Sequence, residues 1–138
     1  MDTAKAMSMI EVNFGKVDGK TLKIEGNRII HTHADYGFTI EADAHDRNPT
    51  EDMHFVEAYN CYIRIKFEKQ VSGMELRFVA GTHYRVQVDG EITQDKVPAG
   101  YAELEVGPCT EVAVLGAKSS TMDKDSSSVI CSLAAMRF

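Results

Sequence analysis

Two histidines stand two positions apart in the stretch IIHTHADYG, which runs from residue 29 to residue 37. In a β-strand, residues two apart point to the same face, so His31 and His33 would present their imidazoles side by side. Paired imidazoles are ligands that zinc and other transition metals prefer. Asp35 continues the same face and adds a carboxylate. The spacing therefore makes the two histidines the first candidates for a metal site.

Two known metal-site families carry patterns similar to this stretch. HTHADY resembles the start of the HxHxDH motif of the metallo-β-lactamases, but Tyr36 replaces its final histidine, and that fold needs a helix next and a longer chain. The pair also resembles the HxH of the cupins, small jelly-roll barrels that hold a metal with two histidines, a glutamate and a later histidine. GEITQDKVPAG, residues 90–100, is similar to the second cupin motif, with a glycine followed after a gap by PxG.

The cupin resemblance implies His31, His33 and Glu103 as ligand candidates, but the match is incomplete. Glu41 lies too far beyond the histidines to serve as the glutamate of the first motif. Near the place of the last ligand stands Glu103 where cupins have a histidine. We therefore expect no metal, no other cofactor and no catalytic residue.

The alternative interpretation of the histidine pair is structural. Histidines on a sheet surface commonly bond to their neighbours and do nothing further. In this interpretation Ile30 and Ala34 face the core, and the two imidazoles face water or a neighbouring molecule.

The remaining polar residues form no recognisable catalytic pattern. The sequence has no GxSxG nucleophile motif and no glycine-rich phosphate loop. Carboxylates are dense in DAHDRNPTED, residues 43–52, but they lack the order of a calcium-binding loop, so we expect a solvated loop. These absences favour a protein that is not an enzyme.

Composition excludes several classes of partner. The chain has 138 residues, 43% of them hydrophobic, and a net charge of −6 with no basic cluster, so nucleic acid is not an expected partner. The three cysteines form no CxxC pair, which is typical of reduced thiols in a protein made in the cytoplasm. We expect no signal peptide, and no apolar run approaches the roughly 18 residues that a membrane span needs.

Alternation with a period of two runs through most of the chain. It is clearest in CYIRIKFEK, where Cys61, Ile63, Ile65 and Phe67 share one face. Such segments recur with turn signals between them, for example Asp-Gly at 18–19 and 89–90. The pattern predicts an all-β protein of about nine or ten short antiparallel strands, as a β-sandwich or a jelly-roll-like barrel. At most one short helix is expected, in TEDMHFVEAY, residues 50–59.

No domain boundary or internal repeat stands out, so we expect a single β domain over residues 1–138. Both ends are apolar and patterned, where free termini are usually polar. We therefore expect segments 1–9 and 129–138 to pack on neighbouring subunits.

Two classes of function follow from these features. The first is a non-enzymatic structural protein, a subunit of a homo-oligomeric or larger assembly such as a phage capsid decoration protein or tail component, located in the virion. Its partners would be its own copies or a capsid or tail protein. The alternative is a small-molecule or sugar-binding jelly roll, with a degenerate cupin-like site at His31, His33 and Glu103.

Overall fold

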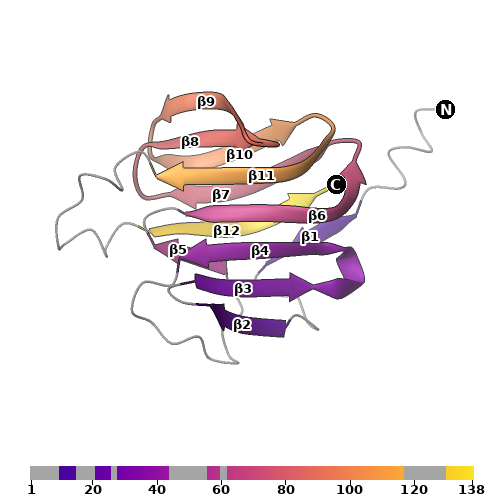
Figure 1. Ribbon diagram of the computed structural model, residues 1–138. Coiled ribbons are helices and arrows are strands. Elements are labelled where there is room, and N and C mark those ends of the chain that lie inside the picture. Colours follow the sequence, from indigo (N-terminus) through magenta and orange to yellow (C-terminus); the bar gives the residue numbers. More distant parts are fainter. Residues whose placement is uncertain (1–9, 15–20, 26–27, 44–55, 60–61, 117–129) are drawn as a thin grey trace.

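In the computed structural model, the described residues are 10–14, 21–25, 28–43, 56–59, 62–116 and 130–138. They form twelve strands, which are labelled in Figure 1, and one short 3₁₀-helix. The strands are β1 (Glu11–Asn13), β2 (Thr21–Glu25), β3 (Arg28–His33), β4 (Phe38–Asp43), β5 (Val56–Tyr59), β6 (Ile63–Val71), β7 (Met74–Ala80), β8 (Tyr84–Val88), β9 (Glu91–Val97), β10 (Gly100–Val106), β11 (Cys109–Gly116) and β12 (Ile130–Arg137). The helix is η1 (Ala34–Tyr36).

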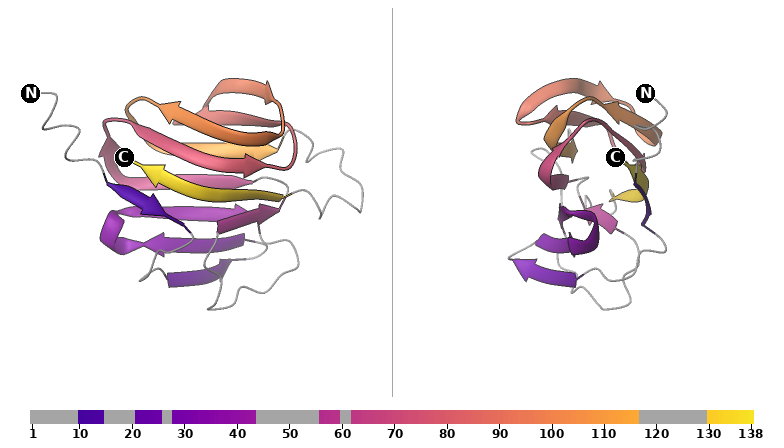
Figure 2. Two further views of the ribbon diagram at one scale, coloured as in Figure 1. Left: turned by 180° about the vertical axis from the view of Figure 1, so that it is seen from behind. Right: turned by 90° about the vertical axis from the view of Figure 1, so that its right-hand side faces the viewer.

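The strands build two antiparallel sheets that lie face to face, as the views in Figure 2 show. One sheet has seven strands in the order β2-β3-β4-β6-β11-β8-β9. The other has five, in the order β1-β12-β7-β10, with β5 also paired to β12. The predicted all-β antiparallel class is confirmed. Of the two expected architectures the chain adopts the sandwich, with twelve strands where nine or ten were expected.

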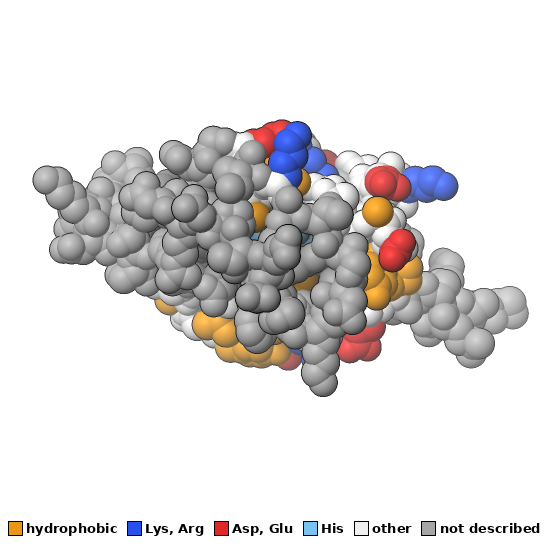
Figure 3. All heavy atoms as spheres, turned by 90° about the horizontal axis from the view of Figure 1, so that it is seen from below, with side chains coloured by type: hydrophobic (Ala, Val, Ile, Leu, Met, Phe, Trp, Pro, Cys, Tyr) orange, Lys and Arg blue, Asp and Glu red, His pale blue; other side chains and the backbone are white. Residues whose placement is uncertain are grey.

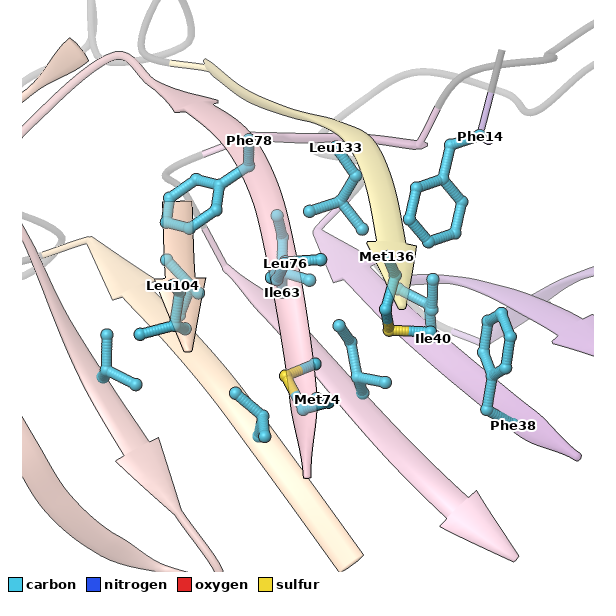
Figure 4. Close-up of a cluster of buried hydrophobic side chains, with 14 of the residues drawn as sticks. Phe14, Phe38, Ile40, Ile63, Met74, Leu76, Phe78, Leu104, Leu133 and Met136 are labelled. Atoms are coloured by element: carbon cyan, nitrogen blue, oxygen red, sulfur yellow. The ribbon is translucent and has the colours of Figure 1, made fainter. Parts of the chain in front are cut away.

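Alternation places every second side chain between the two sheets. In β6, Ile63, Ile65 and Phe67 are buried, whereas Lys66 and Glu68 are exposed. This is the facing predicted from the sequence for these residues. Figure 4 shows the side chains that meet in the core, which come from both sheets: Phe14, Phe38, Ile40, Ile63, Met74, Leu76, Phe78, Leu104, Leu133 and Met136.

Residues 130–138 belong to the body of the sandwich. β12 lies inside the five-stranded sheet, paired with β7 on one side and with β1 and β5 on the other. Its Leu133 and Met136 are 1% exposed. Residues 130–137 thus pair within this chain, and packing of segment 129–138 on a neighbouring subunit stays a prediction. Segment 1–9 lies outside the described residues.

The Asp89-Gly90 turn joins β8 to β9, as predicted. Both residues have positive φ, 50° and 87°, as a two-residue type I′ hairpin requires. The Asp89 carboxylate accepts hydrogen bonds from the Thr110 amide, the Thr110 hydroxyl and the Glu111 amide, each at 2.9 Å. These bonds tie the hairpin to β11 and lower the pKa of the Asp89 carboxyl. The other predicted turn, at 18–19, lies outside the described residues.

The short helix lies elsewhere than expected. Residues 56–59 of the predicted helical segment form strand β5, and residues 50–55 lie outside the described part. Among the described residues the helix is η1, a single turn between β3 and β4. In the part of the chain that the structure describes, no helix is long and apolar enough to cross a membrane.

Candidate functional site

His31 and His33 lie inside the sandwich, 0% and 2% exposed. β3 pairs with β4 so that His31 stands opposite Ile40 and His33 opposite Phe38, and both partners face the core. The imidazole of His33 stacks on the Phe38 ring, with centroids 4.6 Å apart and planes 20° apart. The prediction that the imidazoles face water or a neighbour is therefore wrong.

The histidines are buried because of which face β3 turns toward the core. Adjacent strand residues point to opposite faces, so the strand can bury either Ile29 or Ile30 but not both. The structure buries Ile29 with the two histidines and leaves Ile30 half-buried on the outer face. Ala34, expected in the core, is exposed in η1. The flat faces of the His33 imidazole serve as packing surface among aromatic rings.

The structure does not bring the three predicted ligand candidates together. Glu103 projects from the outer face of the five-stranded sheet, opposite Arg77, whereas both histidines face the space between the sheets. Among the described side chains, no three His, Cys, Asp or Glu residues are grouped so that they could hold a metal ion. The carboxylates of segment 43–52 lie outside the described side chains.

An aromatic cluster continues from His33 toward one end of the sandwich. Phe38 makes edge contacts with Phe67 of β6, at 6.2 Å, and with Phe138, which follows β12, at 5.7 Å. Phe67 and Phe138 contact each other, and their centroids lie 5.1 Å apart. The ring centroid of Tyr36, in η1, lies 6.2 Å from the ring centroid of Phe38. Packing thus gathers rings from three separate segments of the chain at this end.

The η1 turn is fixed to this end of the sandwich by its backbone. Gly37 closes the turn in the left-handed conformation, with φ of 75°, and its amide donates to the carbonyls of His33 and Ala34. The carbonyl of Gly37 accepts a hydrogen bond from the Glu68 amide at 2.9 Å. Glycine suits this position because other residues rarely adopt such a φ. The turn therefore holds Asp35 and Tyr36 beside the end of β6.

A cleft of about 350 Å³ opens between η1 and the end of β6. Its walls are residues 34–37 and residues 67–71, and Phe138 completes it. Figure 1 shows η1, the C-terminus and this end of β6 on the same right-hand side of the molecule. On that side, the view from below in Figure 3 shows acidic side chains next to hydrophobic ones.

The cleft combines an aromatic floor with a polar rim. Three of its lining residues are aromatic, namely Tyr36, Phe67 and Phe138. Four others carry polar groups and are exposed to water: Asp35, Glu68, Lys69 and Gln70. A concave site of this volume, apolar at its base and with few polar groups, is typical of small-ligand sites.

Sequence reasoning missed this site. It placed Phe67 in the core and took Tyr36 only as a departure from a metal motif. Nothing in the sequence joins positions 36, 67 and 138, since only packing of the two sheets brings them together. A second cleft, about 280 Å³ between β8, β9 and β10, has no aromatic lining residue.

The outer face of the five-stranded sheet carries a separate polar and apolar surface. Tyr101 and Val79, paired across β10 and β7, are 61% and 48% exposed. The Tyr101 hydroxyl donates to Glu103 at 3.2 Å. Nearby on β7, the Glu75 carboxylate accepts from Arg77, at 3.3 Å. We call Tyr101, Val79 and Glu103 the Tyr101 surface.

The outer face of the seven-stranded sheet is occupied by its own interactions. The guanidinium of Arg28 lies 3.8 Å from the ring centroid of Tyr62. Arg64 donates to the Tyr62 hydroxyl and to Glu111, both at 3.1 Å. Because these groups already pair with one another, this face offers less free hydrogen-bonding capacity than the cleft.

Cys109 is the cysteine whose side chain the structure describes, and it is a buried, free thiol. Burial, with a smaller contribution from the charge of Asp89, raises the pKa of its thiol to about 11. A thiol with so high a pKa is protonated at neutral pH and is a weak nucleophile. Cys109, one of the cysteines expected to be reduced, is thus a free thiol in the core.

Comparisons with known proteins add little about function. No protein-family model matches the chain, and no curated protein matches it. Among solved structures, the chain is similar to a mutant of a family 29 carbohydrate-binding module, studied for its mechanism of ligand recognition. The two are 10% identical, over 94% of this chain and 89% of that chain, with a TM-score of 0.40.

Proposed function

We propose that this protein is a non-catalytic binding module that holds a carbohydrate ring in the cleft between η1 and the end of β6. The observation that carries the proposal is the combination of three aromatic side chains at the base with four polar residues at the rim. A sugar ring has the complementary build, since C–H groups cover its faces and hydroxyls project from its edge.

Each part of the cleft has a role in this proposal. The half-buried rings of Tyr36 and Phe138 supply flat apolar surface for the C–H face of the sugar, and the buried ring of Phe67 packs against Phe138. Asp35 and Gln70 at the rim supply acceptors and donors for its hydroxyls, and hydrogen bonds to a carboxylate are the stronger ones. The volume of about 350 Å³ lies at the lower end of the range for small-molecule sites.

A glycan array, followed by calorimetry with the best ligand, tests the proposal. Tyr36→Ala should lower the affinity at least about tenfold, because a stacked ring contributes on the order of 1 kcal/mol beyond its buried area. Tyr101→Ala is the matched control, since it removes an exposed tyrosine from the opposite sheet. Equal losses in both variants, or no glycan bound by the wild type, would overturn the proposal.

A second candidate function is binding of protein, including self-assembly, through the Tyr101 surface. Tyr101 and Val79 are among the largest exposed apolar side chains of the described residues. Tyrosine and arginine are the residue types that dominate binding energy at protein interfaces, and Arg77 lies beside them. The sequence predicts that the protein is a subunit of an assembly and that it is located in a virion. Both stay predictions, and both belong to this second candidate function.

Size-exclusion chromatography with light scattering measures the mass of the protein in solution and tests the second candidate function. If the Tyr101 surface mediates self-assembly, the wild type is an oligomer and Tyr101→Ser shifts it to the monomer mass. Tyr36→Ala is then the control and leaves the mass unchanged. A wild type that elutes as a monomer at all concentrations would contradict self-assembly through this surface.

A further inference from the structure

The charges around the cleft are unequal. Asp35 and Glu68 place two carboxylates on its rim, against the single ammonium of Lys69. Lys69 is exposed, and its charge sits at the end of a flexible stem that can turn toward water. The carboxylates are on shorter side chains, so they stay nearer the backbone of the cleft. A ligand in the cleft therefore meets a net negative rim.

The Glu68 carboxylate lies close to the η1 turn. One of its oxygens, Oε2, lies 3.7 Å from the point that a Cβ on Gly37 would occupy. The carboxylate thus lies over the η1 turn, on the wall opposite its own strand. The Gly37 carbonyl accepts from the Glu68 amide, so the backbone of Glu68 is held beside the same turn, and its carboxylate is one of the groups that line the cleft.

The aromatic floor acts in the same direction as the rim. The faces of aromatic rings carry partial negative charge and attract cations, and clusters of such rings bind ammonium groups. Tyr36, Phe67 and Phe138 line the cleft together, and Phe67 contacts Phe138 at 5.1 Å. A protonated amine at the base of the cleft would meet rings below it and carboxylates beside it.

From this arrangement we infer that the ligand of the cleft is cationic, an amino sugar with a free ammonium group. This inference rests on the proposed function and narrows its ligand class. A neutral sugar would use the rings and the hydrogen bonds but would bring no positive charge to the two carboxylates. The amine adds a charge-assisted hydrogen bond and a cation–π contact.

A pair of sugars with the same rings, one cationic and one neutral, tests the inference on the full chain. Glucosamine trimer and its N-acetylated counterpart share their rings, and at about pH 6 only the first is cationic, as expected of a sugar amine. Affinities are measured by calorimetry for the wild type and for Asp35→Asn and Glu68→Gln, which remove charge at constant shape. Glu103→Gln is the control, because it removes an exposed carboxylate outside the cleft.

The expected result is a preference of about fivefold to tenfold for the cationic trimer, lost in Asp35→Asn or Glu68→Gln and kept in Glu103→Gln. Added salt should lower the affinity for the cationic trimer more than the affinity for the neutral trimer. Equal or tighter binding of the neutral trimer, still lost in Tyr36→Ala, would overturn the inference and leave the sugar site intact. Binding of neither trimer, with no hit on the glycan array, would overturn both.

Discussion

The ring centroids of Phe67 and Phe138 lie 5.1 Å apart, and the ring planes are inclined at 51°. The two rings join the two sheets at the base of the cleft. Phe67 belongs to β6 of the seven-stranded sheet, and Phe138 follows β12 of the five-stranded sheet. Phe138 is also anchored by two backbone hydrogen bonds to Ile10, ahead of β1. The floor of the cleft is therefore part of the packed core, which makes it preorganised.

Phe138→Leu separates the role of this ring in binding from its role in packing. Leucine keeps apolar volume against Phe38 and Phe67 but loses the flat face. We expect a small loss of stability, under about 1.5 kcal/mol, together with a several-fold loss of affinity for the sugar. Thermal unfolding and calorimetry on the same sample check both. A variant that keeps full affinity would show that the ring does not contact the ligand.

Substitutions in β12 test whether it is an integral strand of this chain. Leu133→Ala and Met136→Ala each remove a fully buried side chain, and we expect losses of about 2–5 kcal/mol in the free energy of unfolding. Ala134→Ser, at an exposed position, serves as control. Urea denaturation of the isolated protein gives all three values. If Leu133→Ala were as mild as the control, residues 130–138 would pack outside their own subunit.

Asp89 predicts a pH dependence of stability. Its pKa is lowered by the bonds from Thr110 and Glu111, so its contribution is fully present above the ordinary carboxyl pKa of 3.8 and is lost as pH falls through the lowered value. Asp89→Asn keeps the left-handed turn residue and removes the charge. Its Tm should be lower than that of the wild type at neutral pH, and the difference should shrink in acid. A difference in Tm that is the same at neutral and acid pH would contradict this account. Glu91→Gln, on the same hairpin, is the control.

Cys109 should resist alkylation in the folded protein. Its thiol is buried and its pKa is raised to about 11, so little thiolate is present at about pH 8. Peptide mapping after iodoacetamide treatment should find Cys109 modified only when urea is added. Modification at equal rates with and without urea would show that the thiol is not buried.

The fold was predictable because period-two alternation reports directly on which face of a strand is buried. In β6 the inward residues are those that the pattern indicates, namely Ile63, Ile65 and Phe67. For the strand of His31 and His33, alternation did not predict the buried face. Either phase of IIHTH presents an isoleucine, so hydrophobicity could not decide, and the aromatic stack of His33 on Phe38 is a tertiary contact.

The cleft could not be predicted for a related reason. Tyr36, Phe67 and Phe138 each have an ordinary local role, in a turn, in a strand and beyond a strand. Their chemistry arises only from the register and closure of two sheets, which a single sequence does not report. Glu103 failed as a ligand candidate in the same way, because the sheet to which its strand belongs decides what it can approach.

Backbone chemical shifts of isotope-labelled protein, followed while glucosamine trimer is added, test the central claim most directly. The account predicts concentration-dependent shifts confined to the amides of Asp35 to Gly37, Phe67 to Val71 and Phe138. Shifts centred on Val79 and Tyr101 would contradict it, as would a spectrum that no glycan changes.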